Sequence, residues 1–169
     1  TEYSKNHYFL DSIYADTSQQ HNYFNRYYGN PTPSITEDVR ITDIEVWKST
    51  TTSVINKSNE RNANAFISLP PLPAGQTQYD SSRRRDDFTP TPGIEEKARF
   101  ILLTKDVDYT LHEETGYITF LTQIQEVDIV AVAYRTRLFK YGEFISSAAT
   151  DSQRLVLKLI KPQSLVPLY

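Results

Sequence analysis

One segment near the middle of the chain, residues 108–144, constrains the fold more than any other. Within it, residues 129–134 read Ile-Val-Ala-Val-Ala-Tyr and are apolar at every position rather than at every second one. Such a run is typical of a β-strand covered on both faces, and a strand of that kind lies inside a sheet rather than at its edge. The segment therefore predicts a β-rich fold with a central strand at about 128–137.

A β-hairpin is predicted immediately before this strand, over residues 109–121. Two short runs rich in β-branched and aromatic residues flank the polar stretch from Glu113 to Gly116. Gly116 can adopt the positive φ that a tight turn often needs, because it has no Cβ. Residues 100–103 and 155–160 are the further strands that we expect in the same sheet.

The N-terminal part combines helical and extended patterns. Apolar residues recur at three- and four-residue spacing in two sets, which predicts two short helices there. The sets are Phe9, Leu10, Ile13 and Tyr14, and then Tyr23, Phe24, Tyr27 and Tyr28. Residues 39–51 and 65–69 predict a second antiparallel pair with Trp47 in its core, joined by a polar connection at 56–64, and residues 94–99 predict a helical turn.

A proline-rich stretch at residues 70–94 interrupts these patterns. It contains the charge run Arg83-Arg84-Arg85-Asp86-Asp87 followed by Phe88. Its composition does not favour a regular element, so we expect an exposed, mobile loop. If this loop has a function, contact with an acidic partner surface through Arg83, Arg84, Arg85 and Phe88 is the interpretation that we favour.

Length and composition narrow the possible classes of protein. A chain of 169 residues is one domain's worth, and its net charge of -3 gives no overall attraction to nucleic acid. The absence of cysteine excludes a disulfide framework and a thiolate nucleophile. No apolar run is long enough for a membrane-spanning helix or a signal peptide. Because the chain starts at Thr1 and contains no methionine, we expect it to be part of a larger protein.

No pattern in the sequence indicates catalysis. The histidines His7, His21 and His112 lie far apart and have no motif partners, and His112-Glu113-Glu114 would point to opposite faces of a strand. The acidic pairs Glu95-Glu96 and Asp86-Asp87 are adjacent in sequence, which rarely suits acid-base hydrolysis. We therefore expect no enzyme activity, catalytic residue, metal or cofactor, although a hydrolase remains an alternative that a cleft with convergent carboxylates would support.

Several blocks of residues along the chain occur together in a known family. In chain order they are Tyr8-Phe9-Leu10, Ile44-Glu45-Val46-Trp47, residues 61–67, residues 109–119, Ala131-Val132-Ala133-Tyr134, Gly142-Glu143-Phe144 and residues 157–161. This arrangement resembles a recurring module of the SprA (Sov) family, the outer-membrane translocons of the bacterial type IX secretion system. The chain departs from the family pattern at Lys48-Ser49-Thr50 and Ser68, and residues 70–94 match none of it.

The resemblance implies a noncatalytic module of a protein-export pore that serves gliding motility and cell-surface protein secretion. It also implies that the partners are other parts of the translocon barrel, its accessory subunits and the secreted proteins. The pattern lacks the apolar banding of a lipid-facing wall, so we expect an insertion on the extracellular side of the outer membrane, or alternatively on the periplasmic side. A cell-surface carbohydrate-binding or adhesin-like module is the alternative function.

The sequence therefore predicts a single module over residues 1–169 with an α+β fold. It would consist of helices plus a β-hairpin at 1–69, the exposed loop at 70–94 and an antiparallel sheet at 95–169. In this fold the short N-terminal helices lie against a mainly antiparallel sheet, and a β-sandwich is the structural alternative.

Overall fold

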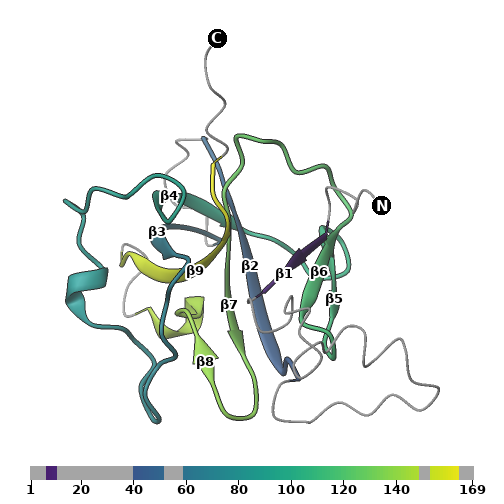
Figure 1. Cartoon of the computed structure of the whole chain (residues 1–169), viewed down its shortest axis with the longest axis horizontal. Helices are drawn as coiled ribbons and strands as arrows, with labels where there is room; N and C mark the ends of the chain where they lie inside the picture. The colour runs from purple at the N-terminus through teal and green to yellow at the C-terminus, as the bar shows by residue number, and fades with distance from the viewer. Residues whose placement is uncertain (1–6, 11–39, 52–58, 149–152, 164–169) are drawn as a thin grey trace.

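The computed structural model describes residues 7–10, 40–51, 59–148 and 153–163. The regular structure of these residues is almost entirely β (Figure 1). Their helical content is limited to two 3-10 turns, η2 (Ser81–Arg83) and η3 (Ile145–Ser147). The strands belong to two sheets, one of six strands and one of three.

Five strands of the larger sheet close into a barrel. They are β2 (Asp43–Ser49), β3 (Glu60–Phe66), β4 (Glu95–Leu102), β7 (Val130–Arg135) and β9 (Leu155–Lys161). Around the barrel the order is β2, β4, β3, β9 and β7, and β7 pairs back with β2. The β3–β9 pair is parallel, and the other pairs are antiparallel. A short strand, β8 (Lys140–Tyr141), forms a hairpin with β7.

The barrel interior is filled by a few large side chains and several small ones. Trp47 and Phe100 are fully buried, and alanines on β3 and β7 make room for them. The interior of an eight-stranded barrel is just wide enough for side chains to fill it. A barrel of five strands is narrower, so small interior residues must alternate with large ones. The buried residues of this cluster are Trp47, Ala63, Ala65, Phe100, Ile129, Ala131, Ala133, Leu155, Leu157 and Leu159.

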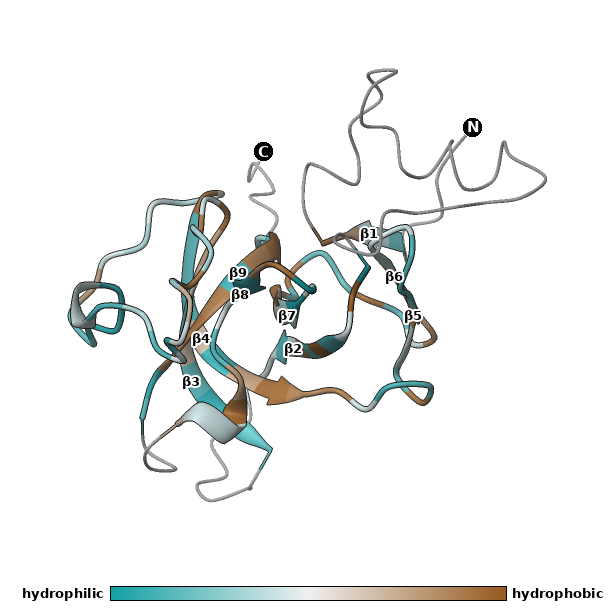
Figure 2. Ribbon diagram, turned by 90° about the horizontal axis from the view of Figure 1, so that it is seen from below, coloured by the Kyte–Doolittle hydropathy of each residue, from teal (hydrophilic) through white to brown (hydrophobic). Residues whose placement is uncertain are grey.

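The smaller sheet covers one side of the barrel. It consists of β1 (His7–Phe9), β6 (Tyr117–Phe120) and β5 (Tyr109–His112), in that order. β5 and β6 form the hairpin that the sequence predicted, and Gly116 has a φ of 66° at its turn. The inner face of this sheet packs against β2 and β7, as Figures 1 and 2 show from two directions.

The predicted central strand is confirmed as β7. It is hydrogen-bonded to β2 on one side and to β9 and β8 on the other. Ala131 and Ala133 point into the barrel, whereas Val130, Val132 and Tyr134 belong to the cluster between the barrel and the smaller sheet. Both faces are buried because β7 separates two cores, which is why its sequence is apolar without alternation.

The predicted α+β class is wrong, because the described residues are nearly all β and contain no helix of seven or more residues. The β-sandwich alternative is not formed either, since the strands close on themselves. The first predicted helix would begin at Phe9, but Tyr8 and Phe9 belong to β1 and pair with β6. The rest of that helix and the helix predicted at 23–28 lie outside the described residues.

The predicted helical turn at 94–99 is also wrong, because Glu95 begins β4. Its residues favour helix locally, yet hydrogen bonding to β3 on one side and β2 on the other prevails over that preference. β2 and β3 do not form the predicted antiparallel pair, because β4 lies between them. Trp47 nevertheless lies in the core, as predicted.

β3 includes most of what the sequence indicated as a polar connection. Glu60, Arg61 and Asn64 are buried on this strand. Distant segments supply partners to two of them: Arg99 Nε lies 3.0 Å from Glu60 Oε2, and Asn64 Nδ2 donates to two backbone carbonyls of the 70–94 segment. The parts predicted at 1–69 and 95–169 consequently share one barrel.

Candidate functional site

The segment at residues 70–88, which we call the strap, lies along the outside of the barrel (Figure 1). Most of its side chains are exposed, as the sequence predicted. However, Leu72 and Tyr79 are buried in a third apolar cluster with Phe66, Leu69 and Val156. The backbone N–H of Leu72 donates to Lys140 O at 2.7 Å. The strap is therefore anchored to the barrel rather than free of it.

The four residues predicted to contact a partner do not converge on one point. The Arg83 guanidinium lies over the Phe66 ring at 5.2 Å, and Phe88 packs against the same ring at 5.4 Å. Arg85 pairs with Asp87 on the surface, and Arg84 turns inward to Glu143. Three of the four therefore bind the strap to the rest of the molecule and Arg85 binds it to itself, and contact with an acidic partner stays a prediction.

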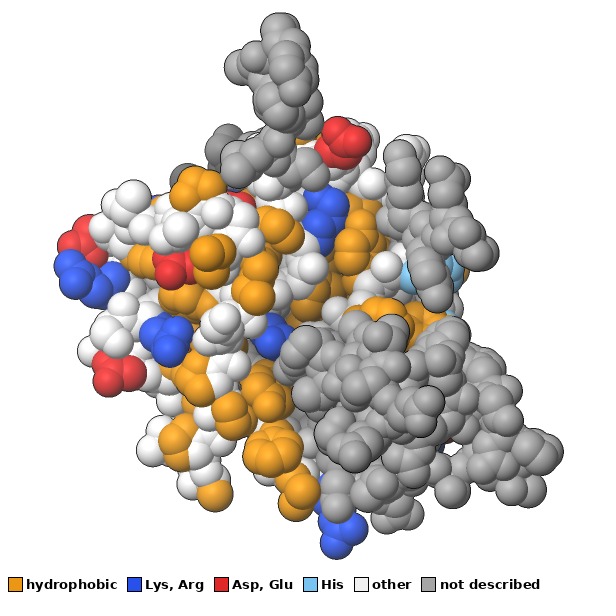
Figure 3. Space-filling model, in the orientation of Figure 1, with side chains coloured by type: hydrophobic (Ala, Val, Ile, Leu, Met, Phe, Trp, Pro, Cys, Tyr) orange, Lys and Arg blue, Asp and Glu red, His pale blue; other side chains and the backbone are white. Residues whose placement is uncertain are grey.

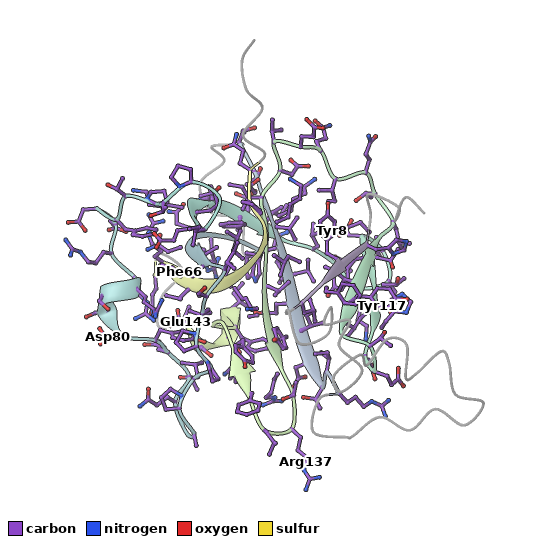
Figure 4. The ribbon with its side chains drawn as sticks, viewed as in Figure 1. Tyr8, Phe66, Asp80, Tyr117, Arg137 and Glu143 are labelled. Atoms are coloured by element: carbon purple, nitrogen blue, oxygen red, sulfur yellow. The ribbon has the colours of Figure 1, made fainter. Side chains whose placement is uncertain are left out.

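Glu143 is one of the buried charged residues of the described part, and its side chain is only 1% exposed. Its Oε1 accepts from the Val156 N–H at 3.0 Å, and its Oε2 accepts from the Tyr79 N–H at 2.7 Å and from the Arg84 guanidinium. In the view of Figure 4, Glu143 lies to the right of Asp80, which is on the strap. Burial raises the pKa of Glu143, while the two N–H donors and Arg84 oppose the rise.

Tyr79 and Gly142 complete the attachment. The Tyr79 hydroxyl donates to Pro70 O at 2.6 Å and accepts from the Gly142 N–H at 3.1 Å. Burial raises the pKa of Tyr79 to about 12, so its hydroxyl remains protonated at neutral pH. We call Tyr79, Arg84, Gly142 and Glu143 the latch, since together they join the strap to the corner between β8 and β9.

The charged groups of the latch are bonded to one another and to the backbone. Both oxygens of Glu143 accept hydrogen bonds from the protein, and its side chain is only 1% exposed. The Arg84 guanidinium is also engaged, because it donates to Arg154 O at 3.1 Å as well as to Glu143. The Glu143 carboxylate therefore holds together two segments that are distant in the sequence.

The acidic pairs that the sequence offered for hydrolysis point to separate partners. Asp86 pairs with Arg154 at 2.8 Å, whereas Asp87 pairs with Arg85 at 2.6 Å. Glu95 Oε2 accepts from the Thr91 N–H, and Glu96 Oε1 accepts from the Gln163 N–H. Neither pair forms two facing carboxyl groups, which acid-base hydrolysis needs.

Two of the three histidines meet in space, which their sequence positions did not indicate. His7 on β1 and His112 on β5 both contact the Thr119 hydroxyl between them, at 2.7 and 3.3 Å. Burial and then the nearby His7 lower the pKa of His112. The described residues contain no group of three or more side chains suited to hold a metal, and His21 lies outside them.

A polar groove of about 320 Å³ lies at the end of the barrel where β7 leads into β8. Its charged groups are paired within the protein: Asp43 with Arg135, and Glu45 Oε1 with the Ile145 N–H at 2.7 Å. Lys140 Nζ lies 5.1 Å from the centre of the Phe144 ring. The lining residues are Asp43, Ile44, Glu45, Arg135, Lys140, Phe144 and Ser146.

Replacing Glu45 with glutamine is expected to stabilise the protein more at pH 7 than at pH 4. Burial raises the pKa of Glu45 above its ordinary value near 4.5, although the Ile145 N–H and Lys140 oppose the rise. The folded state therefore binds the Glu45 proton more tightly than the unfolded state does. The stability that this group contributes below pH 4.5 is lost as the pH rises through its folded pKa.

Glutamine retains an oxygen for the Ile145 N–H and does not ionise, so it avoids that loss. Urea unfolding of both proteins at pH 4 and pH 7 measures the difference. A change in the free energy of unfolding that is identical at the two pH values would contradict the prediction.

No known protein family model matches the sequence, and a search of the curated proteins finds no similar protein. Function is therefore inferred from the residues of this chain. Sequence reasoning missed the latch, although an acidic residue between Gly142 and Phe144, close to a strand, was a usable signal. Its partner Arg84 could not be identified, because 59 positions separate the two residues.

Proposed function

We propose that the chain is a noncatalytic structural module of an outer-membrane protein-export translocon of the type IX secretion kind. One observation carries the proposal: the residues that resemble the family are the residues that build and lock the barrel. Ile44-Glu45-Val46-Trp47 lies in β2, Ala131-Val132-Ala133-Tyr134 lies in β7, and residues 157–161 lie in β9. These three strands are neighbours.

The remaining blocks support the same interpretation. Residues 61–66 fall in β3, and residues 117–119 fall in β6. Gly142 and Glu143 form the latch that holds the strap. Residues that are buried and bonded to one another are needed for folding. A family motif made of such residues suits an architectural module better than a binding or catalytic one.

A closed barrel with an attached second sheet is suited to act as a brace. Closure removes the open edges of the five-stranded barrel, at which strands of other chains would add, so the barrel can be placed beside a larger β-structure without merging with it. Along the described segments, the chain contains no helix that is both long enough and apolar enough to cross a membrane. We propose that the module shapes the vestibule of the pore and offers surfaces to accessory subunits and passing cargo.

The proposal is tested in the full-length protein that contains this chain. Gly142→Leu, which would unfold the latch corner, is expected to abolish export of a reporter carrying the C-terminal secretion signal. Gly75→Ala is the matched control, because a Cβ at Gly75 meets nothing within 4 Å. Immunoblots must show equal amounts of both variants in the outer membrane. Normal export by the Gly142→Leu protein would refute the architectural role.

The side of the membrane is tested by limited proteolysis of intact cells. The Arg85 side chain is 62% exposed on the strap, and trypsin cleaves after such residues. Cleavage at Arg85 in intact cells is expected, since we propose an extracellular position. Cleavage only after the outer membrane is opened would place the module on the periplasmic side.

A carbohydrate-binding module is a second candidate, favoured by one specific observation. The outer face of the smaller sheet carries a cluster of rings centred on Tyr117, which stacks on His112 at 4.0 Å and contacts Phe9 and His7 edge-on. Aromatic faces of this kind bind sugars by stacking. Glycan-array binding by the chain that Tyr117→Ala abolishes would support this candidate over the translocon.

A further inference from the structure

The polar groove of about 320 Å³ lies at the mouth of the five-stranded barrel. Glu45 on β2 is directly opposite Ala133 on β7, so both side chains are on one face of the sheet, and Ala133 belongs to the cluster inside the barrel. Glu45 therefore lies on the interior face, near the start of β2. In Figure 1 this is the lower end of the barrel, where β7 leads into β8. The mouths of β-barrels are frequent positions of small-molecule sites.

The size and lining of the groove suit a small polar molecule. Small-molecule sites have volumes of about 300–1,000 Å³, and the groove falls at the lower end of that range. Four of its seven lining residues are charged, namely Asp43, Glu45, Arg135 and Lys140. An apolar occupant would bury these charges without giving them partners. On the described part of the face that Figure 3 shows, charged side chains instead lie scattered among hydrophobic ones.

The half-buried carboxylate of Glu45 is held in place through one oxygen only. Its Oε1 accepts from the Ile145 N–H at 2.7 Å, which fixes the orientation of the group. Among the described residues, no donor forms a hydrogen bond with Oε2. The groove therefore contains an oriented carboxylate oxygen that can accept a hydrogen bond from a ligand.

The ammonium group of Lys140 has a similar position in the same groove. It lies over the Phe144 ring, 5.1 Å from the ring centre, and the Phe144 side chain packs against the barrel core. Within the described segments, Lys140 forms no ion pair with a carboxylate. Burial raises the pKa of Glu45 and the positive charge of Lys140 opposes the rise, so the two groups attract each other without touching. Asp43 and Arg135, in contrast, pair with each other.

A zwitterion matches this pair of groups better than an ion of one sign. A ligand ammonium group can donate to Glu45 Oε2, and a ligand carboxylate can accept from Lys140, which gives two charge-assisted hydrogen bonds. An anion would place a second negative charge beside Glu45, and a cation would place a second positive charge beside Lys140. An uncharged sugar would neutralise neither group.

We propose that the groove binds a small zwitterion, a free α-amino acid or a short peptide, whose ammonium group contacts Glu45 and whose carboxylate contacts Lys140. This inference depends only on the groove and would stand if the translocon proposal failed. The expected gain in stability of Glu45→Gln at pH 7 agrees with it, because a charged group that lowers the stability of the fold is typical of a binding site.

Nuclear magnetic resonance titration of the full, isotope-labelled chain with L-leucine and with the dipeptide alanyl-alanine tests the proposal. At least one of the two is expected to bind and to shift the Ile145 N–H signal, because that group is bonded to Glu45. N-acetyl-leucine lacks the ammonium group and leucinamide lacks the carboxylate, so each should bind roughly tenfold or more weakly than leucine. Tighter binding of leucine would identify a free amino acid as the ligand, and tighter binding of the dipeptide would identify a peptide.

Two variants assign the two ends of the ligand. Glu45→Gln retains the acceptor for the Ile145 N–H and should remain folded, yet it should remove the preference for leucine over N-acetyl-leucine. Lys140→Gln should remove the preference for leucine over leucinamide. Glu96→Gln is the matched control, because Glu96 Oε1 also accepts from a backbone N–H and burial also raises the pKa of Glu96, but this residue does not line the groove.

The control should bind the zwitterions as the unchanged chain does. Three results would each overturn the proposal: no binding of either zwitterion, binding of N-acetyl-leucine or leucinamide as tight as that of leucine, or the same loss in Glu96→Gln as in Glu45→Gln. Unaltered binding by both Glu45→Gln and Lys140→Gln would overturn it too, because the ligand would then lie elsewhere.

Discussion

Gly142→Ala is expected to lower the free energy of unfolding by roughly 2–5 kcal/mol. Gly142 has a φ of +79°, a conformation that costs other residues about 1–2 kcal/mol. A Cβ there would also lie 2.9 Å from Ala133 Cα and Val132 O, both of them backbone atoms of β7 that cannot move without disturbing the barrel. Overpacking of this kind costs a further ~1–3 kcal/mol.

Urea unfolding of Gly142→Ala and two control variants separates the two causes. Gly75 and Gly93 each have a φ of +80°, but a Cβ at either position meets nothing within 4 Å. Their alanine variants should therefore show only the conformational cost of about 1–2 kcal/mol. If Gly142→Ala is as stable as these controls, the predicted clash between a Cβ at residue 142 and the backbone of β7 is wrong.

Glu143→Ala is expected to lower the free energy of unfolding by about 3–5 kcal/mol, the usual cost of removing one partner of a buried ion pair. The substitution leaves the Tyr79 and Val156 N–H groups without acceptors in a buried place. It also leaves Arg84, only 19% exposed, beside the empty position. Because these donors come from the strap and from β9, the loss should loosen the strap before the barrel unfolds.

Two measurements test this expectation. Urea unfolding gives the overall loss, and trypsin cleavage after Arg85 under native conditions reports the local release of the strap. Cleavage should become faster in Glu143→Ala by more than the change in overall stability accounts for. Asp87→Ala is the control, because it breaks the surface pair with Arg85 and should leave unfolding unchanged. Equal stability of Glu143→Ala and the control would show that the latch does not hold the strap.

The features that the sequence predicted correctly depend on neighbours along the chain or on a strong burial pattern. β7 was recognisable because an uninterrupted apolar run of this length is typical of a strand that is buried on both faces. The β5–β6 hairpin was recognisable because its strands and turn are contiguous, with Gly116 at the position that needs it. Burial of Trp47 followed from its place in an extended apolar segment.

The errors have one physical origin. Local spacing at Phe9 and local propensity at residues 94–99 favoured helix, yet both segments pair with strands that are distant in sequence. β3 was mistaken for a connection because its Glu60, Arg61 and Asn64 are polar. Arg99 and the strap supply partners to Glu60 and Asn64, and both partners lie far away in the sequence. No pattern within a short window contains that information.

The sequence by itself determined the local elements whose hydrogen bonds or burial pattern are encoded within a few residues, namely the hairpin and the strand covered on both faces. It also determined the absence of cysteine chemistry. Only the tertiary structure decided that five strands close into a barrel and that Arg83 and Arg84 join the strap to the rest of the molecule. The physical reason is that closure and the latch both depend on contacts between segments far apart in the chain. Such contacts form only when the whole chain satisfies its backbone and buries its apolar surface at once.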